Sequence, residues 1–364
     1  MSNKLKLNDL DRAGQVSITS QLVDRLRAAI EAGELPPGEK LPTTRALAEE
    51  AGINHLTAVR VYRRLAELGY VTAAVGRGTF VRSVPPASED RDPIDWQSAV
   101  LPELRSSPSS EMFLATYMIP SDPELLSLAT GAPDPTHYPA AELAELSSAV
   151  LGELGGHALD YVDADGVRGL REQIAERGRE AGFAQTAEEI LVTTGARQAL
   201  DLVCRATIEP GDVVVCESPT FIGMLSSLQA TGARVFGVPV DEEGLDTDAL
   251  ERILARHEVK LVAVQSSCQN PTGADLSPAR AQRLLELARE RSFFVLEDGV
   301  YATIRFEGAP RPRLRHLAPD HVVYVDSLSK TIGGGLRIGW VAASGPVRQR
   351  LTWLKLQTDM NSSS

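Results

Sequence analysis

The sequence predicts an α/β fold in which an N-terminal winged helix-turn-helix precedes a larger domain with a mostly parallel sheet. Residues 43–68 predict a short helix, a glycine turn and a longer helix with a basic face. Beyond them, short apolar runs alternate with helical stretches, as in a parallel sheet covered on both faces. The formal net charge of -12 divides into +3 over residues 1–82 and -15 beyond, which indicates a basic module joined to an acidic one.

The composition favours a globular protein of the cell interior. The chain has 364 residues and is 43% hydrophobic, enough for two or three domains with a sizeable core. Its three cysteines lack C-x-x-C spacing, so we expect a reducing compartment, no disulfide framework and no metal site. No apolar run approaches the length of a membrane span, and the N-terminus has no apolar signal region. A cytoplasmic location is therefore expected.

Local signals mark the first two helices. Apolar residues at helical spacing predict a helix over residues 18–32, which the stretch GELPPGEKLP ends. Thr43 is expected to cap a second, short helix that buries Leu47 and stops at Gly52.

The third helix and a hairpin wing carry the expected DNA contacts. After the glycine turn, we expect Leu56, Val59 and Leu65 to face the core while the arginines of this helix face outward. GYVTAAVGRGTFV alternates around two glycines, which predicts a β-hairpin. The candidate contacts to phosphates or bases are Arg45, His55, Thr57, Arg60 and Arg77. Charge alone leaves open a small helical domain whose arginines are merely solvated.

The remaining chain divides into a linker and a sheet domain. Residues 83–125 are rich in Ser, Pro and Asp, which predicts a linker with a short helix around Met112. We therefore expect a DNA-binding domain over residues 1–82 and an α/β domain over residues 126–364. The expected strands are EILVTT, DVVVCES, RVFGVPV, KLVAVQ, FFVLED and VVYVDS.

The stretch SLSKTIGGGLRIGW, residues 327–340, predicts a lysine that binds an aldehyde cofactor. Pyridoxal phosphate needs an amine for its aldehyde, a carboxylate at its pyridine nitrogen and a cup of donors for its phosphate. Lys330 would form the Schiff base, Ser327 and Ser329 would supply hydroxyls, and Arg337 would clamp the phosphate.

Further candidates follow the predicted strands, where ligands of open α/β sheets bind. Asp298 could keep the pyridine nitrogen protonated, and Asn270 could donate its amide to the ring hydroxyl. The turn TTGAR offers the amides of Gly195 and Ala196, beside Arg197, to an anion at a helix N-terminus. Phe221 could stack on the ring. Each signal is weak alone, and their joint order along one chain carries the prediction.

These motifs resemble known families. Residues 33–81 resemble the winged helix of GntR-family bacterial regulators, and the chain from about Leu128 resembles fold-type I aminotransferases. Together they are similar to MocR-subfamily GntR regulators. The resemblance implies the roles already assigned, adds Tyr301 at the ring hydroxyl, and implies a homodimer in which Tyr161 reaches the neighbouring subunit's phosphate. It also places GAPDP, residues 131–135, near the substrate entrance.

The chain departs from this family at its end. Members continue into a smaller C-terminal domain with an arginine for the substrate carboxylate, whereas this sequence stops at LQTDMNSSS. We expect a pyridoxal-phosphate-dependent transcription regulator that senses an amino compound, or the cofactor itself, through an internal aldimine at Lys330. Two alternatives stay open: an active aminotransferase acting on an amino acid, and a DNA-binding remnant with an inert sensor.

Overall fold

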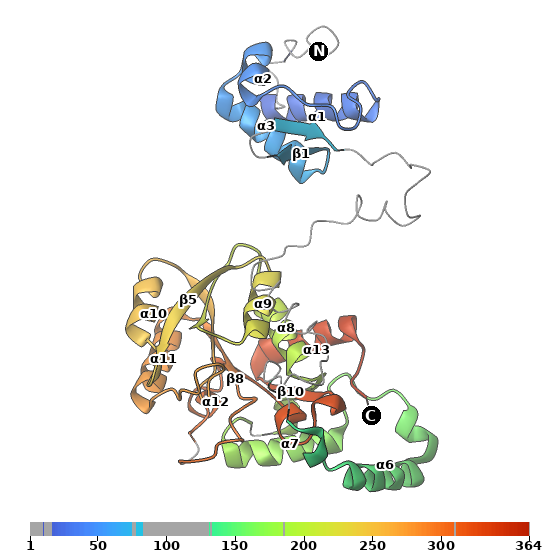
Figure 1. Ribbon diagram of the computed structural model, residues 1–364, viewed down its shortest axis with the longest axis vertical. Helices are drawn as coiled ribbons and strands as arrows, with labels where there is room; N and C mark the ends of the chain where they lie inside the picture. The colour runs from blue at the N-terminus through green and yellow to red at the C-terminus, as the bar shows by residue number, and fades with distance from the viewer. Residues whose placement is uncertain are drawn as a thin grey trace, which may run out of the picture. The chain divides into compact units, whose positions relative to one another are not determined.

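The structure, a computed structural model, describes residues 10, 17–74, 78–82, 131, 133–184, 186–308 and 311–363 (Figure 1). The chain forms two compact units, Met1–Leu104 and Arg105–Ser364. The expected linker helix around Met112 and the wing residue Arg77 lie outside the described residues. Among the helices that are described, none has the length and apolarity to cross a membrane.

The first unit is a three-helix domain with a two-stranded hairpin. Its elements are α1 (Ile18–Glu31), α2 (Thr44–Ala51), α3 (His55–Glu67), β1 (Val71–Ala74) and β2 (Gly78–Val81). The two strands pair in antiparallel register, from Val71 opposite Val81 to Ala74 opposite Gly78. The predicted winged helix-turn-helix is therefore confirmed in its order of elements.

Capping residues fix the tight turn of this domain. The Thr43 hydroxyl accepts a hydrogen bond from the Ala46 amide at 3.2 Å and so starts α2. Gly52 ends α2 in the left-handed region at φ 61°, which favours glycine. The Asn54 side chain then accepts from the Leu56 amide at 2.8 Å and starts α3. Both signals expected from the sequence, at Thr43 and Gly52, are confirmed.

One expected core residue of α3 was wrong. Leu56 is 65% exposed, and Val59 is only partly buried. α3 begins at His55, and its first buried residue is Ala58, two positions after Leu56. The buried residues of the helix follow helical spacing from there. These residues are Ala58, Val61, Tyr62 and Leu65. They pack with Leu47, which is fully buried as expected.

The second unit is built on an eight-stranded sheet of order β3-β10-β9-β8-β7-β4-β5-β6. The strands are β3 (Ile190–Thr194), β4 (Val213–Ser218), β5 (Arg234–Asp241), β6 (Gly244–Leu245), β7 (Val259–Val264), β8 (Phe294–Asp298), β9 (Val322–Ser327) and β10 (Ile338–Ala342). The run from β9 to β5 is parallel throughout. All six expected strands are present, and the mostly parallel sheet is confirmed.

β10 was not expected, and it is antiparallel to both of its neighbours, β3 and β9. β10 begins directly after Arg337, within the stretch that was interpreted only as a cofactor motif, so its strand was not predicted. By lying between β3 and β9, β10 carries Arg337 and Gly339 next to the end of β3.

Helices cover both faces of the sheet. They are α6 (Ala140–Leu154), α7 (Arg168–Ala181), α8 (Ala196–Thr207), α9 (Ile222–Ala230), α10 (Thr247–Leu254), α11 (Pro278–Arg291), α12 (Leu314–Leu317) and α13 (Gly345–Thr358), with short 3-10 turns at 135–137, 155–159, 187–189, 328–330 and 334–336. Successive strand residues alternate between the faces, so that in β4 Val214 packs against α8 and Val215 against α10 and α11.

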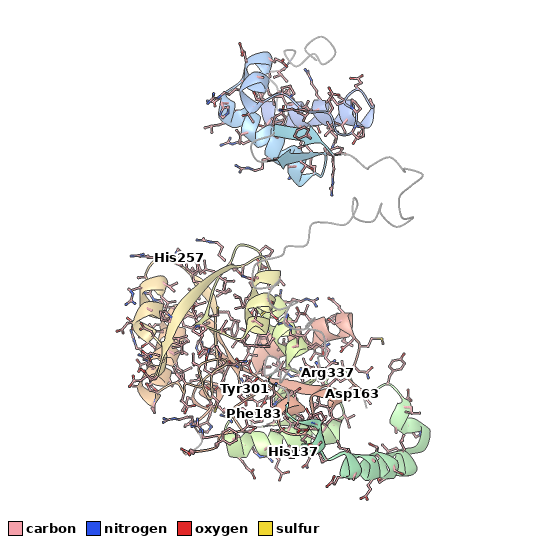
Figure 2. The ribbon with its side chains drawn as sticks, in the orientation of Figure 1. His137, Asp163, Phe183, His257, Tyr301 and Arg337 are labelled. Carbon is pink, nitrogen blue, oxygen red and sulfur yellow. The ribbon has the colours of Figure 1, made fainter. Side chains whose placement is uncertain are left out.

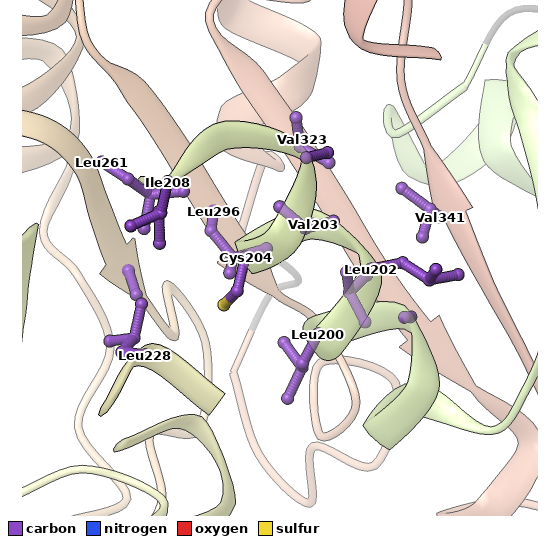
Figure 3. Close-up of a cluster of buried hydrophobic side chains, with 14 of the residues drawn as sticks. Leu200, Leu202, Val203, Cys204, Ile208, Leu228, Leu261, Leu296, Val323 and Val341 are labelled. Atoms are coloured by element: carbon purple, nitrogen blue, oxygen red, sulfur yellow. The ribbon is translucent and has the colours of Figure 1, made fainter. Parts of the chain in front are cut away.

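The larger cluster centres on α8. Leu200, Leu202 and Val203 of this helix pack on strand residues such as Leu296 and Val341 (Figure 3). Each of these side chains is at most 1% exposed, and full burial of a side chain this size contributes about 1.5–3 kcal/mol. The packed helix fixes the position of its own N-terminus above the strand ends.

We expect Leu47→Ala to destabilise the first unit by about 2–5 kcal/mol, because it leaves a cavity in a fully buried cluster. Amide hydrogen exchange of α1 and α3 in the whole chain measures this loss. Leu56→Ala is the matched control: its side chain is 65% exposed, so the change should stay within about 0.5 kcal/mol. Equal losses in the two variants would contradict the assigned core.

Candidate functional site

The carboxyl ends of the parallel strands bring the candidate residues to one edge of the sheet. β3 runs in the same direction as β9 because β10 is antiparallel to both, so β3 ends at this edge too. The candidates at or just beyond strand ends are Gly195, Ala196, Arg197, Phe221, Asn270, Asp298, Tyr301 and Ser327. This edge is where open α/β sheets bind their ligands.

Lys330 lies in the short turn Leu328–Lys330 that follows β9. Its Nζ donates to the carbonyl of Gly131 at 2.8 Å and lies 5.6 Å from the centroid of the Tyr301 ring. Burial lowers the pKa of this partly buried amine, which increases its uncharged fraction. Lys330 and Tyr301 are therefore brought together, and the contact with Gly131 was not foreseen.

Asp298 ends β8 as a buried carboxylate. It accepts hydrogen bonds from the Val300 amide at 3.1 Å and from Gln265 Nε2 at 3.2 Å. Burial raises the pKa of Asp298 to about 6, and the neighbouring Glu297 adds to that rise. At neutral pH the group is mostly ionised, which is the form that pairs with a protonated ring nitrogen.

Gln265 links Asp298 to its neighbours and was missed by the sequence analysis. Its backbone N–H donates to Glu217 Oε2 at 3.0 Å. Its side-chain oxygen accepts from the backbone N–H of Asn270 at 2.8 Å. Gln269 Nε2 also donates to Glu217, at 3.3 Å. Gln265 directly follows β7, so a polar residue at a buried strand end was the available signal.

The N-terminus of α8 offers donors for an anion. The helix begins after Gly195, at φ 79°, without a side-chain cap, so its first amides point outward. Arg337 Nη2 donates to the Thr194 carbonyl at 3.0 Å, and a Cβ at Gly195 would lie 2.5 Å from that nitrogen. Glycine is therefore required for Arg337 to lie against this helix end.

A cavity of about 410 Å³ opens beside these donors. Its lining includes Thr194, Arg197, Gln198, Ser226, Ser227 and Arg337. Two guanidinium groups and several hydroxyls suit a phosphate group, and the one carboxylate of the lining, Asp201, faces Arg205 at 3.6 Å. Figure 2 shows Arg337 and Tyr301 in the middle of the second unit.

Three candidates have contacts of other kinds, although Arg197 also lines the cavity beside Arg337. Arg197 donates through Nη1 to the Gly223 carbonyl, which ties α8 to α9. Phe221, partly buried, packs against the cluster around α8. Tyr161 is 79% exposed, and within the described residues no hydrogen bond or ring contact joins its side chain to the other candidates. A single copy of the chain does not bring Tyr161 into the site.

The described DNA-contact candidates lie on α2 and α3. Arg45, His55 and Arg60 are exposed, and Thr57 is partly buried. His55 Nε2 shares a hydrogen bond of 3.0 Å with the Thr44 hydroxyl, which joins the start of α3 to the start of α2. The structure thus presents these side chains on two helices joined by one turn.

Family models match both units. Residues 18–81 match the gntR family of bacterial regulatory proteins, and residues 123–364 match the aminotransferases of class I and II. The second match covers most of the chain and the first covers the winged helix. The chain belongs to the MocR-type regulators of the gntR family. Such a MocR-type chain joins a winged helix to an aminotransferase fold.

Relatives of both kinds are similar to this MocR-type chain. The HTH-type transcriptional regulator YdfD of Bacillus subtilis is 28% identical over 94% of this chain and 71% of its own length. The probable rhizopine catabolism regulatory protein MocR of Rhizobium meliloti is 30% identical over 91% of this chain and 66% of its own. The 2-aminoadipate transaminase of Thermus thermophilus is 35% identical over 74% and 67%.

Solved structures match the second unit. The α-aminoadipate aminotransferase LysN of Thermus thermophilus, complexed with N-(5'-phosphopyridoxyl)-L-leucine, is 33% identical with a TM-score of 0.64. The match covers 71% of this chain and 64% of that one. An archaeal alanine:glyoxylate aminotransferase has a TM-score of 0.66 at 32% identity, over 71% and 66%. The MocR-type chain thus spans about two thirds of the length of these structures.

We expect Glu217→Gln to change how stability depends on pH. Burial raises the pKa of Glu217 from 4.5 to about 8, so the native state holds this proton more tightly than the unfolded state. The free energy of unfolding of the unchanged chain therefore falls as pH rises from about 4.5 to about 8. The glutamine of the variant does not titrate, so its free energy of unfolding should not fall in this way. Between the low and the high end of this pH window, the free energy of unfolding of the variant should rise by more than about 1 kcal/mol relative to that of the unchanged chain.

Urea unfolding at a series of pH values measures the difference between the two chains. Glu258→Gln is the control, because that side chain is 85% exposed. Parallel pH profiles for the Glu217→Gln variant and the unchanged chain would show that this carboxyl is not protonated in the native state.

Proposed function

We propose that this MocR-type chain is a DNA-binding transcription regulator, acting in the cytoplasm, that depends on pyridoxal phosphate and senses an amino compound or the cofactor itself. One observation carries the proposal: Lys330, Asp298 and the uncapped N-terminus of α8 meet at one sheet edge in a chain that begins with a winged helix. The cofactor-bound relative of the same fold supports it.

The donor set fits pyridoxal phosphate. The space against Gly195, which a Cβ would fill, leaves Arg337 beside the first amides of α8, and Ser327 ends β9 at the same edge of the sheet. Gly195, Ala196, Arg197, Ser327 and Arg337 would hold the phosphate. Phe221 would lie on the ring, and Asn270 and Tyr301 would donate to its hydroxyl. When bound, the cofactor supplies an electron sink for groups attached to its aldehyde carbon.

The protein's own groups prepare Lys330 and Asp298 for these partners. Burial keeps a larger share of the Lys330 amine uncharged, as a nucleophile requires. Gln265 Nε2 donates to one oxygen of Asp298 and the Val300 backbone amide donates to the other, so both oxygens are held in place. Asp298 would hold the proton on the pyridine nitrogen of the bound ring.

A homodimer would complete the site. α6 buries none of its own residues, and its exposed apolar side chains include Leu146, Val150, Leu151 and Leu154. Tyr161 follows this helix and is exposed as well. A second copy covering this face would remove apolar surface from water and receive Tyr161 at its phosphate group.

An aminotransferase acting on an amino acid is the second candidate. The transaminase of Thermus thermophilus, with 35% identity, favours it. Both functions use the same cofactor residues, so those residues cannot separate them. In the enzyme, the Lys330 amine would also move a proton as a general base.

The Lys330→Ala variant tests the cofactor site. Titration of the unchanged chain with pyridoxal phosphate should produce the visible absorbance of lysine-bound cofactor, and the variant should lose it because it lacks the amine. Lys260→Ala, a lysine whose side chain is 47% exposed, should keep the band. If the Lys330→Ala variant retains the band, another amine binds the cofactor and the proposal fails.

Addition of amino acids to the cofactor-loaded chain separates the two functions. A spectral change without a keto acid is expected of a sensor. Stoichiometric or catalytic keto-acid formation would favour the aminotransferase.

Arg60→Ala tests the DNA-binding surface. Loss of one phosphate contact should reduce the salt slope of binding by about 0.9, measured with random-sequence duplex DNA over a range of salt concentrations. On an operator, loss of a base contact should weaken binding by about 1–3 kcal/mol. Arg27→Ala on α1, where Arg27 pairs with Asp24 at 3.1 Å, should leave both unchanged. If the Arg60→Ala variant binds DNA as the unchanged chain does, Arg60 does not contact DNA and other residues form the DNA-binding surface.

A further inference from the structure

A second cavity, of about 630 Å³, lies behind the lysine turn. Its walls come from α7, from residues 302–308, from the turn Leu328–Lys330 and from β10. Its volume lies in the range of small-molecule sites, about 300–1,000 Å³. None of the candidate residues lines it except Ser327, so it is not explained by the cofactor site.

Arg313 supplies an unsatisfied cation to this cavity. The residue is 4% exposed, and within the described part of the chain its guanidinium donates from Nη1 to the Ser267 hydroxyl at 3.5 Å. Nε has no partner, and no ion pair within the described part of the chain includes Arg313. Its charge acts on two buried carboxylates, because it opposes the rise in pKa that burial causes at Glu297 and at Asp326. No ion pair joins either carboxylate to this guanidinium within the described residues, and its Nε keeps no partner there.

Asp326 supplies a carboxyl group to the same cavity; burial raises the pKa of Asp326 to about 7, and an ammonium group beside it would favour its ionised form. It is 4% exposed and accepts from the Tyr324 hydroxyl at 2.8 Å and from the Ser327 amide at 2.7 Å. Arg313 lies near this group, since its guanidinium carbon is 6.0 Å from the centroid of the Tyr324 ring. The two groups line one cavity without forming an ion pair with each other, as far as the described residues extend.

The remaining wall combines apolar and aromatic side chains with three further charged residues, Arg177, Glu180 and Arg305, of which Arg305 pairs with Asp275 at 2.5 Å. Its apolar members include Leu170, Ile174, Phe183, Leu328, Ile338 and Trp340. Phe183, labelled in Figure 2, stacks on Trp340 with ring centroids 6.1 Å apart. The buried Trp340 Nε1 has no acceptor among the described residues, so it is a further donor without a partner.

We propose that this cavity binds a free α-amino acid with an aromatic or large apolar side chain. The ligand's carboxylate would pair with Arg313, its ammonium with Asp326, and its side chain with the Phe183 and Trp340 rings. An α-amino acid carries its ammonium and its carboxylate on the same carbon, which suits a cation and a carboxyl group that line one cavity. Binding here is non-covalent and needs neither the cofactor nor Lys330.

Occupation of the cavity would act on the lysine turn. Ser327, Leu328 and Thr331 line the cavity and flank Lys330 in the chain. A ligand that contacts these residues differently in two positions of the turn would shift Lys330 relative to its Gly131 partner. The cavity is thus a second input to the site at the sheet edge.

Equilibrium dialysis of the full chain against radiolabelled L-phenylalanine tests this inference. We expect saturable binding at millimolar concentration or below, both in the unchanged chain and in Lys330→Ala. L-Phenylalaninol lacks the carboxylate and 3-phenylpropionate lacks the ammonium, so each should bind at least about tenfold more weakly. These comparisons use the unchanged chain and do not depend on a variant that folds.

Variants assign the charges. Arg313→Gln should weaken L-phenylalanine binding at least about tenfold. Arg311→Gln should not, because Arg311 is an exposed neighbour that faces Asp275 at 3.9 Å. Circular dichroism checks that each variant is folded.

Three outcomes would each overturn the inference: no saturable binding to the unchanged chain, equal binding of all three ligands, or unchanged binding by folded Arg313→Gln. Loss of binding in Lys330→Ala would place the amino acid at the cofactor site and overturn it too. If pyridoxal phosphate fails to attach to Lys330 while L-phenylalanine still binds, the proposed function fails and this inference stands.

Discussion

The alignment of strand ends in the parallel sheet is the constraint on which the rest of the second unit depends. It places carboxylates from β4, β8 and β9 in one buried layer, where ionised groups are costly unless they are hydrogen-bonded. Glu297, for example, accepts from the Ser266 hydroxyl at 2.5 Å and from the amides of Leu314 and Arg315 at 3.0 Å each. These bonds tie the segment before β9 to β8. The sheet therefore positions the lysine turn through polar contacts as well as through apolar packing.

Much of the fold could be predicted from the sequence because its signals are local. Thr43 and Gly52 act within one helical turn, and six buried strands appear as apolar runs whose neighbours are helices. Asp298 was identified as a candidate because it stands at the end of such a run, and Lys330 because hydroxyls flank it before three glycines and an arginine. Such residues can be interpreted from their sequence neighbours alone, because their roles do not depend on distant segments. The winged helix was predictable for the same reason, apart from the phase of α3 that exposes Leu56.

The remaining features depend on register between distant segments. Gln265 meets Asp298 only because β7 and β8 align Val264 with Glu297, which no local pattern encodes. The Gly131 carbonyl reaches Lys330 from 199 positions away in the chain. β10 was missed because its residues belong to the same stretch as the lysine, and its antiparallel direction follows from the turn at residues 334–336. Arg313 and Asp326, likewise, share a cavity that only the folded chain creates.

The exposure of Tyr161 has a consequence for the way this regulator would respond in the cell. If that phenol completes the anion cup of a second copy, each cofactor molecule is held by two chains at once. Cofactor occupancy and dimer formation are then linked by mass action. At low protein concentration the dimer would dissociate and release the cofactor even when the cofactor is abundant. The response of the regulator would thus depend jointly on its own expression level and on the supply of vitamin B6. A promoter that it controls would follow both concentrations.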